Sequence, residues 1–167
     1  MNGRRDLAGI GSYRTHADPM QIVSGALHAP RIHFEAPPSD RVPDEMARFI
    51  AWFNDSSPQG SKPLAAITRA AIVHLWFETI HPFEDGNGRL GRALAEKSLA
   101  QSLEAPTLTA LAATINRYKK AYYTQLHRAS QTNRIDAWMV WFADIVLEAQ
   151  GRTIESIRFL IEKTRLL

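Results

Sequence analysis

The sequence predicts a single all-α domain that carries one β-hairpin. Three observations favour this fold class. Apolar side chains recur at helical spacing over most of the chain after residue 43, as in helices with one buried face. Two short β-prone runs, 21–24 and 31–35, flank the segment from Gly25 to Pro30 and predict a hairpin with a longish loop. The length of 167 residues, of which 45% are hydrophobic, suits one domain with its own core.

The N-terminal third of the chain changes character twice. Residues 1–20 are polar without a clear period and are expected to form loop, and the hairpin at 21–35 ends at Pro37-Pro38. A first helix then begins at Pro43, a residue suited to a first helical turn, and runs to about Phe53. The stretch 54–60 is rich in polar and turn-forming residues and predicts a loop.

The rest of the chain is expected to be helical. The predicted helices are 63–80, 87–103, 108–115, 117–130 and 137–166. The first of them stops at His81, because a residue that precedes proline is disfavoured in the α region. Asp136 is a candidate N-cap for the last helix, and Gly151 is a candidate interruption of it.

Composition excludes several classes of protein. The chain has no cysteine, so disulfides and thiolate metal sites are excluded. No apolar run is long enough to predict a transmembrane helix or a secretory signal, and we expect a cytoplasmic protein without membrane partners. The net charge is +3 and the pI about 9.4, but Lys and Arg are spread along the chain, so charge alone favours no partner.

The segment 81–92, HPFEDGNGRLGR, carries the chemistry. It lies between two predicted amphipathic helices, so its second half forms a helix N-terminus, where free backbone N–H groups bind anions. Gly86 and Gly88 have no side chain and let a phosphate approach the backbone closely. Asn87 can add an amide donor.

Charged residues complete this segment. Arg89 and Arg92 are spaced i,i+3 and share a helix face, which suits the several oxygens of a polyphosphate. Asp85 precedes them, and a carboxylate beside phosphates is typical of Mg²⁺ sites. His81 can take a proton from an attacking hydroxyl. Together these residues predict phosphoryl or nucleotidyl transfer, in which positioning and charge neutralisation supply most of the catalysis.

The segment resembles the signature H-x-F-x-D/E-G-N-G-R-x-x-R of the Fic family at every defined position. The resemblance extends over most of the chain, because the hairpin at 21–35 is similar to the Fic flap and the C-terminal aromatic residues are similar to that half of the fold. It implies a Fic-type helical domain and a protein adenylyltransferase (AMPylator). Such an enzyme uses Mg²⁺ and ATP to place AMP on a Ser, Thr or Tyr hydroxyl of a target protein that docks on the flap.

The resemblance also implies roles for single residues. In the order of the chain, these are the general base His81, the loop anchor Phe83, the Mg²⁺ ligand Asp85, the anion hole Gly86 to Gly88 with Asn87 at the α-phosphate, and Arg89 and Arg92 at the β- and γ-phosphates. The adenine is expected between the flap and the region of Tyr123. Several relatives carry Asn seven positions after that tyrosine, where this chain has Ser130.

Two sequence features bear on the reaction and its control. The Doc kinases, which resemble this family, carry Lys where this chain has Gly88, so Gly88 favours attack on the α-phosphate. The inhibitory motif S/T-x-x-x-E-G/N of many relatives is missing from the sequence. We therefore expect residues 1–167 to be a single catalytic core, excised from a longer protein or restrained by a separate antitoxin.

Other interpretations remain open. The same fold could use UTP, GTP or CDP-choline, act as a kinase, or remove AMP as a deAMPylase, or it could be a non-catalytic nucleotide-binding regulator. A nucleic-acid-binding module is disfavoured, because no recognition motif accompanies the high pI. The spacing Gly86-x-Gly88-x-x-Gly91 also spells the dinucleotide-binding fingerprint, but a strand should precede that motif. We expect His74 to be a packed or exposed residue rather than a metal ligand, and Tyr123 to belong either to the core or to the adenine site.

Overall fold

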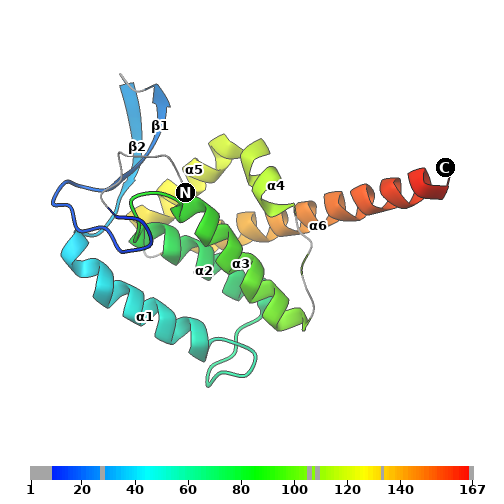
Figure 1. The fold of residues 1–167 in the computed structure, drawn as a ribbon, viewed down its shortest axis with the longest axis horizontal. Coiled ribbons are helices and arrows are strands. Elements are labelled where there is room, and N and C mark those ends of the chain that lie inside the picture. The colour runs from blue at the N-terminus through cyan, green and yellow to red at the C-terminus, as the bar shows by residue number, and fades with distance from the viewer. Residues whose placement is uncertain (1–8, 27–28, 105–106, 108–109, 133, 166–167) are drawn as a thin grey trace.

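Helix α2 (Ala66–Ile80) lies at the centre of the computed structural model and contacts α1 (Val42–Asp55), α3 (Asn87–Leu103) and α6 (Asp136–Arg165) (Figure 1). The structure describes residues 9–26, 29–104, 107, 110–132 and 134–165. The middle and end of α2 are apolar on nearly all sides, which is the pattern of a helix buried on every face. Its few polar side chains are therefore forced into the interior.

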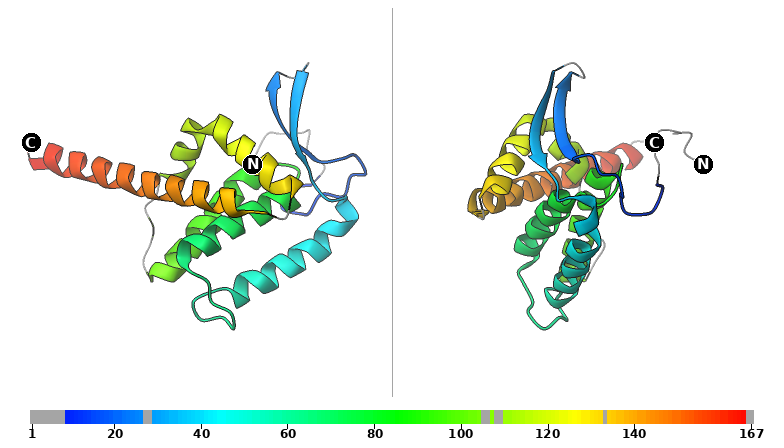
Figure 2. Two further views of the ribbon diagram at one scale, coloured as in Figure 1. Left: turned by 180° about the vertical axis from the view of Figure 1, so that it is seen from behind. Right: turned by 90° about the vertical axis from the view of Figure 1, so that its left-hand side faces the viewer.

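The remaining elements are arranged around this helix. They are β1 (Gln21–Ala26), β2 (Ala29–Glu35), the short 3-10 helix η1 (Ser39–Arg41), α4 (Leu111–Arg117) and α5 (Lys119–Gln131). The two strands form an antiparallel hairpin, and β2 lies beside α5 (Figure 2). The prediction of an all-α domain with one hairpin is confirmed.

The interior consists of two apolar clusters, one on each side of α2. The larger one joins α2 and α3 to the C-terminal helices, and its members include the fully buried Trp138 and Phe142. The smaller one joins α2 to α1 through Phe49, Val73 and Phe77. Helix α2 is thus packed on two sides, and Phe83 of the segment that follows it packs against the smaller cluster.

Some element boundaries differ from the predictions. Helix α6 passes through Gly151 without interruption, since a helix tolerates one glycine at a cost of about 1 kcal/mol. The hairpin ladder continues through the pair Gly25 and Pro30 to Ala26 and Ala29, so the connection is shorter than the predicted loop. The predicted helix 117–130 is broken at Tyr118, which separates α4 from α5.

A few predictions fall on residues outside the described part of the chain. These are the start of the N-terminal loop at 1–8 and of the short helix at 108–109. In the described part of the chain, no helix is both long and apolar enough to cross a membrane. Helix α6 extends beyond the other elements, and its residues from Ile154 to Arg165 are exposed (Figure 2).

Candidate active site at the junction of α2 and α3

His81 caps the C-terminus of α2 in a left-handed backbone conformation, with φ 48° and ψ 58°. A positive φ costs a non-glycine residue about 1–2 kcal/mol and is found where the surroundings enforce it, often in functional sites. Pro82 follows and prevents the helix from continuing. The backbone thus turns sharply at the residue that the sequence predicts to be the base.

Arg14 holds this turn in place. Its backbone N–H donates to the carbonyl of Pro82 at 2.9 Å, and its Nε donates to the carbonyl of His81 at 2.8 Å. Its guanidinium also donates to the carbonyls of Ile80 and Pro37. Arg14 is 2% exposed, so these bonds are shielded from water. Sequence reasoning missed Arg14, because it falls in a stretch without periodicity and its partners are distant in the chain.

The ring of His81 is half-buried and turned toward Glu78. Its Nδ1 lies 3.3 Å from the backbone carbonyl of Glu78 and 3.9 Å from the carboxylate Oε2 of the same residue. Burial lowers the pKa of His81, the bond to the Glu78 carbonyl opposes this change, and the charge of Arg14 adds to it. His81 is therefore neutral at neutral pH, and a proton on Nδ1 leaves Nε2 free to act as a base.

Phe83 and Asn87 fix the loop that follows. The Phe83 ring packs into the smaller cluster, with ring centroids 5.6 Å from Tyr13 and 6.5 Å from Phe77. The buried amide of Asn87 accepts from the Phe83 N–H at 3.0 Å and donates to the Phe83 carbonyl at 2.7 Å. Because this amide is engaged within the loop, its expected contact with an α-phosphate stays a prediction, and the backbone is the better placed donor.

The first turn of α3 forms an anion-binding backbone. Gly86 precedes it with φ 89°, a conformation that favours glycine, and the carbonyl of Gly86 accepts from the N–H of Leu90 at 3.0 Å. The N–H groups of Asn87, Gly88 and Arg89 lie before that first helical bond and have no carbonyl partner within the helix. Their partial positive charge favours a phosphate here.

Charged side chains surround this turn. Asp85 is exposed and lies 3.4 Å from Arg89, with Asp85 Oδ2 and Arg89 Nη2 as the closest atoms. Arg92 is half-buried, and its Nη1 lies 3.3 Å from the point that a Cβ on Gly88 would occupy. A cavity of 250 Å³ opens beside Asp85, Arg89 and Phe83. The structure thus brings the predicted residues of 81–92 together around one helix start.

The side chains near the start of α3 offer few metal ligands of their own. Within the described ranges of the chain, no cluster of three or more His, Asp or Glu side chains could hold a metal ion. Asp85 is a single exposed carboxylate beside an anion-binding backbone. This set fits Mg²⁺ that is held chiefly by phosphate oxygens and water, which is how that ion usually binds.

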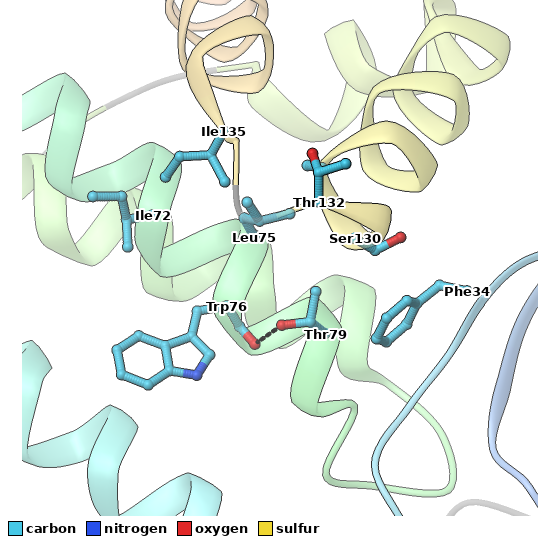
Figure 3. A pocket seen from close by; sticks show the side chains of 9 residues that line it. Phe34, Ile72, Leu75, Trp76, Thr79, Ser130, Thr132 and Ile135 are labelled. Carbon is cyan, nitrogen blue, oxygen red and sulfur yellow. Dashed lines mark hydrogen bonds between the residues drawn. The ribbon is translucent and has the colours of Figure 1, made fainter.

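Two cavities lie between strand β2 of the hairpin and the neighbouring helices. One of 360 Å³ lies between β2, α2 and the α5–α6 connection, and Figure 3 shows Phe34 and Trp76 at opposite ends of it. The other, also of 360 Å³, lies between β2 and the end of α5, with His127 and Ser130 in its wall. Tyr123 is in neither group of lining residues. Its half-buried ring packs on Tyr122 at 5.1 Å, so both interpretations of Tyr123 remain open.

The chain is similar to known proteins of one family. A sequence model of the Fic/DOC family matches residues 1–99. The chain is 30% identical over 118 residues to a Caenorhabditis briggsae protein named protein adenylyltransferase fic-1, which covers 69% of the chain and 21% of that protein. It is 37% identical over 65 residues to a uridine 5′-monophosphate transferase of Xanthomonas campestris pv. campestris (strain 8004), covering 38% of the chain and 12% of that protein.

Solved structures show the same fold. A Fic family protein from Desulfovibrio desulfuricans G20 superposes with a TM-score of 0.73 and 24% identity, over 92% of this chain and 43% of that one. At this identity the likeness concerns the fold alone. The chain spans only 21% and 12% of the length of the two curated relatives described above.

Proposed function

Because the chain belongs to the Fic/DOC family, we propose that it is a protein adenylyltransferase, which transfers AMP from ATP to a Ser, Thr or Tyr hydroxyl of a target protein. One observation carries the proposal. A single loop joins a neutral, half-buried histidine at the end of α2 to the free N–H groups at the start of α3. A base and an anion-binding turn in one loop are what transfer to a hydroxyl needs.

The proposed reaction balances with residues of this loop. His81 Nε2 takes the proton of the target hydroxyl, and the hydroxyl oxygen forms a bond to the α-phosphorus. The bond from that phosphorus to the bridging oxygen breaks, and pyrophosphate leaves with the electron pair. The proton then passes from His81 to water. Backbone N–H groups from Asn87 to Arg89 stabilise the charge that develops, and Arg89 and Arg92 bind the outer phosphates.

Asp85 would hold the Mg²⁺ ion that accompanies ATP, and the ion would neutralise phosphate charge when bound. We also propose that the target docks on the hairpin formed by β1 and β2, since a two-stranded sheet offers backbone groups to an extended peptide. Control of the activity by a separate antitoxin, or by a segment of a longer protein, is part of the same proposal.

The names of the relatives support nucleotidyl transfer, but they differ in the nucleotide that is transferred. Curated relatives from Caenorhabditis briggsae and Aquifex aeolicus (strain VF5) are named as an adenylyltransferase and a probable adenylyltransferase. The Xanthomonas relative is named a uridine 5′-monophosphate transferase, which favours UMP transfer as the second candidate. ATP and UTP differ in the nucleobase, and we expect the nucleobase to bind in the cavity between β2 and the end of α5, which His127 and Ser130 line.

Intact mass spectrometry tests the proposal. Purified protein is incubated with ATP and Mg²⁺, and in parallel with UTP, beside the variants His81→Ala and His16→Ala. We expect the gain of one AMP by self-modification, reduced at least about 10²-fold in His81→Ala and unchanged in the control. ATP binding, measured by calorimetry, should persist in His81→Ala.

Each other outcome has a definite meaning. A gain of UMP alone would replace adenylyl transfer with uridylyl transfer, and a gain of phosphate alone would indicate a kinase. Equal rates in His81→Ala and His16→Ala would contradict the assignment of the base. ATP binding with no mass gain, in the presence of a flap-docking peptide library as acceptor, would favour the nucleotide-binding regulator.

A further inference from the structure

Glu78 is a buried carboxyl group directly behind the candidate active site. It lies on α2, one turn before His81, and is 3% exposed. Its Oε1 is buried and has no hydrogen-bond partner among the described residues. An unpartnered carboxylate oxygen in the interior costs stability, so each such group needs an explanation.

The neighbouring helix is shaped around this carboxyl. A Cβ on Gly91 would lie 2.7 Å from Glu78 Oε1, and a Cβ on Gly88 would lie 3.7 Å from the same atom. Both glycines belong to the first turns of α3, but only the distance at Gly91 is too short for a side chain, so α3 approaches α2 closely there because Gly91 has none. The Glu78 carboxyl occupies the space that a side chain at position 91 would fill.

The same carboxyl reaches both sides of the site. Its Oε2 is 3.9 Å from His81 Nδ1, on the ring edge opposite the nitrogen that would meet the hydroxyl. Its Oε1 and the Nη1 of Arg92 both lie close to the Cβ position of Gly88, at 3.7 Å and 3.3 Å. Glu78 is therefore near both the base and the phosphate-side arginine.

We propose that the Glu78 carboxylate is a positioning residue for the transfer reaction: it faces the Nδ1 edge of His81, keeps the proton of the neutral ring on that nitrogen, and stabilises the positive charge that the ring acquires from the hydroxyl. The inference rests on the proposed function. A base that is oriented by a third group on its far side is a common arrangement in acyl and phosphoryl transfer.

Protonation of Glu78 makes the role measurable. Burial raises the pKa of Glu78 to about 7, and the charge of Arg92 opposes that change. The titratable and charged groups around the pair are His74 on α2, Arg92 on α3, Tyr122 and Tyr123 on α5, and Arg14 beside His81. Glu78 is thus mostly neutral at pH 6 and mostly ionised at pH 8.5, so only the higher pH provides the charge that the proposal uses.

The first test compares Glu78→Gln with wild type across this pH range, using initial rates of nucleotide transfer at saturating ATP. The ratio of the wild-type rate to the Glu78→Gln rate should be near 1 at pH 6 and rise to roughly tenfold or more at pH 8.5. The affinity for ATP should stay the same or increase. Because Glu78→Asp keeps a carboxylate, its rate should rise with pH relative to the rate of Glu78→Gln. Glu148→Gln, which removes a remote ion-paired carboxylate on α6, should match wild type at every pH.

A purely structural Glu78 would give one of two other patterns. Either the rate ratio would stay constant with pH, or the affinity for ATP and the rate would be lost together. Each of these patterns would overturn the proposal. The second test does not need activity: 15N NMR at pH 8.5, where Glu78 is mostly ionised, shows which ring nitrogen of the neutral His81 carries the proton, with the signals assigned from His81→Ala. We expect the proton on Nδ1 in wild type and in Glu148→Gln, and a larger fraction of the Nε2-protonated ring in Glu78→Gln. An unchanged ratio of the two forms overturns the inference, and a changed ratio without transfer from any nucleotide overturns only the proposed function.

Discussion

At the scale of single residues, the candidate base depends on a side chain that lies 67 positions away in the sequence. Arg14 satisfies carbonyl groups on both sides of the turn at His81, and one guanidinium does this because its five N–H donors are fixed in a fork. A lysine has no such fork. The left-handed backbone of His81 is therefore held by a contact that no local pattern encodes.

Arg14→Ala tests this dependence. Removal of the guanidinium leaves buried carbonyl groups unpaired, and we expect a loss of about 2–3 kcal/mol in the free energy of unfolding, together with loss of transfer activity. Arg14→Lys should recover only part of the lost stability and activity. Urea unfolding measures the change, and the exposed Arg48→Ala, which removes one surface ion pair, should stay within about 0.5 kcal/mol of wild type. Equal effects of the two alanine variants would contradict the role of Arg14.

The residues of the candidate site divide by how far apart they are in the chain. His81 to Arg92 could be predicted because they are contiguous, and their spacing alone puts them on one loop and one helix face. Arg14 could not, since tertiary contacts bring it to the site. Glu78 could have been predicted, because it is a charged residue in the apolar part of α2, where every helix face is buried.

At the scale of elements, the close approach of α2 and α3 is the feature that shapes the site. Gly91→Ala would place a methyl group 2.7 Å from Glu78 Oε1 and 3.3 Å from His74 Nδ1, so the buried Glu78 carboxyl or the helices themselves would have to shift. We expect a loss of roughly 1–3 kcal/mol in the free energy of unfolding, because both neighbours are buried. Weaker binding of ATP should accompany it, since the start of α3 moves.

Gly151→Ala is the matched control, because Gly151 is also a helical glycine and a Cβ there would meet nothing within 4 Å. It should stabilise the protein by about 0.5–1 kcal/mol through helix propensity alone. Thermal unfolding of both variants gives the comparison. A stabilised Gly91→Ala would show that the helices do not need the glycine. The continuity of α6 through Gly151 has the same basis, since one glycine costs a long helix only about 1 kcal/mol and is a poor predictor of a helix end.

At the scale of the whole molecule, the helical fold class follows from periodicity, but the arrangement of two clusters around α2 does not. Which face of a helix meets which neighbour depends on contacts between distant segments, such as the bond of 2.9 Å from Trp138 Nε1 to the carbonyl of Ala71. Full burial of α2 also encloses three ionisable side chains, Arg69, His74 and Glu78, and of these His74 and Glu78 change charge within the range from about pH 4 to 7. His74 stacks on Trp138 and Phe142 within the larger cluster. The stability of the folded chain is therefore linked to pH through its centre.

The two groups act in opposite directions. Burial lowers the pKa of His74 from 6.5 to about 4, so between these values the unfolded chain binds the extra proton and stability rises with pH. Burial raises the pKa of Glu78 from 4.5 to about 7, so between these values the folded chain binds the extra proton and stability falls with pH. From about pH 4.5 to 6.5 the two effects nearly cancel, so these two groups should make the free energy of unfolding of wild type change little with pH.

Single substitutions should reveal each slope. In Glu78→Gln only His74 remains, and the free energy of unfolding should rise by about 1.4 kcal/mol per pH unit over that window relative to wild type. In His74→Gln only Glu78 remains, and the free energy should fall with pH by a similar amount. Urea unfolding at pH 4.5, 5.5 and 6.5 measures both. Parallel curves of the free energy of unfolding against pH for the two variants would mean that the groups titrate in the folded protein as they do in the unfolded chain. Opposite slopes would show that the burial of α2 also determines the charge of Glu78 next to the candidate base.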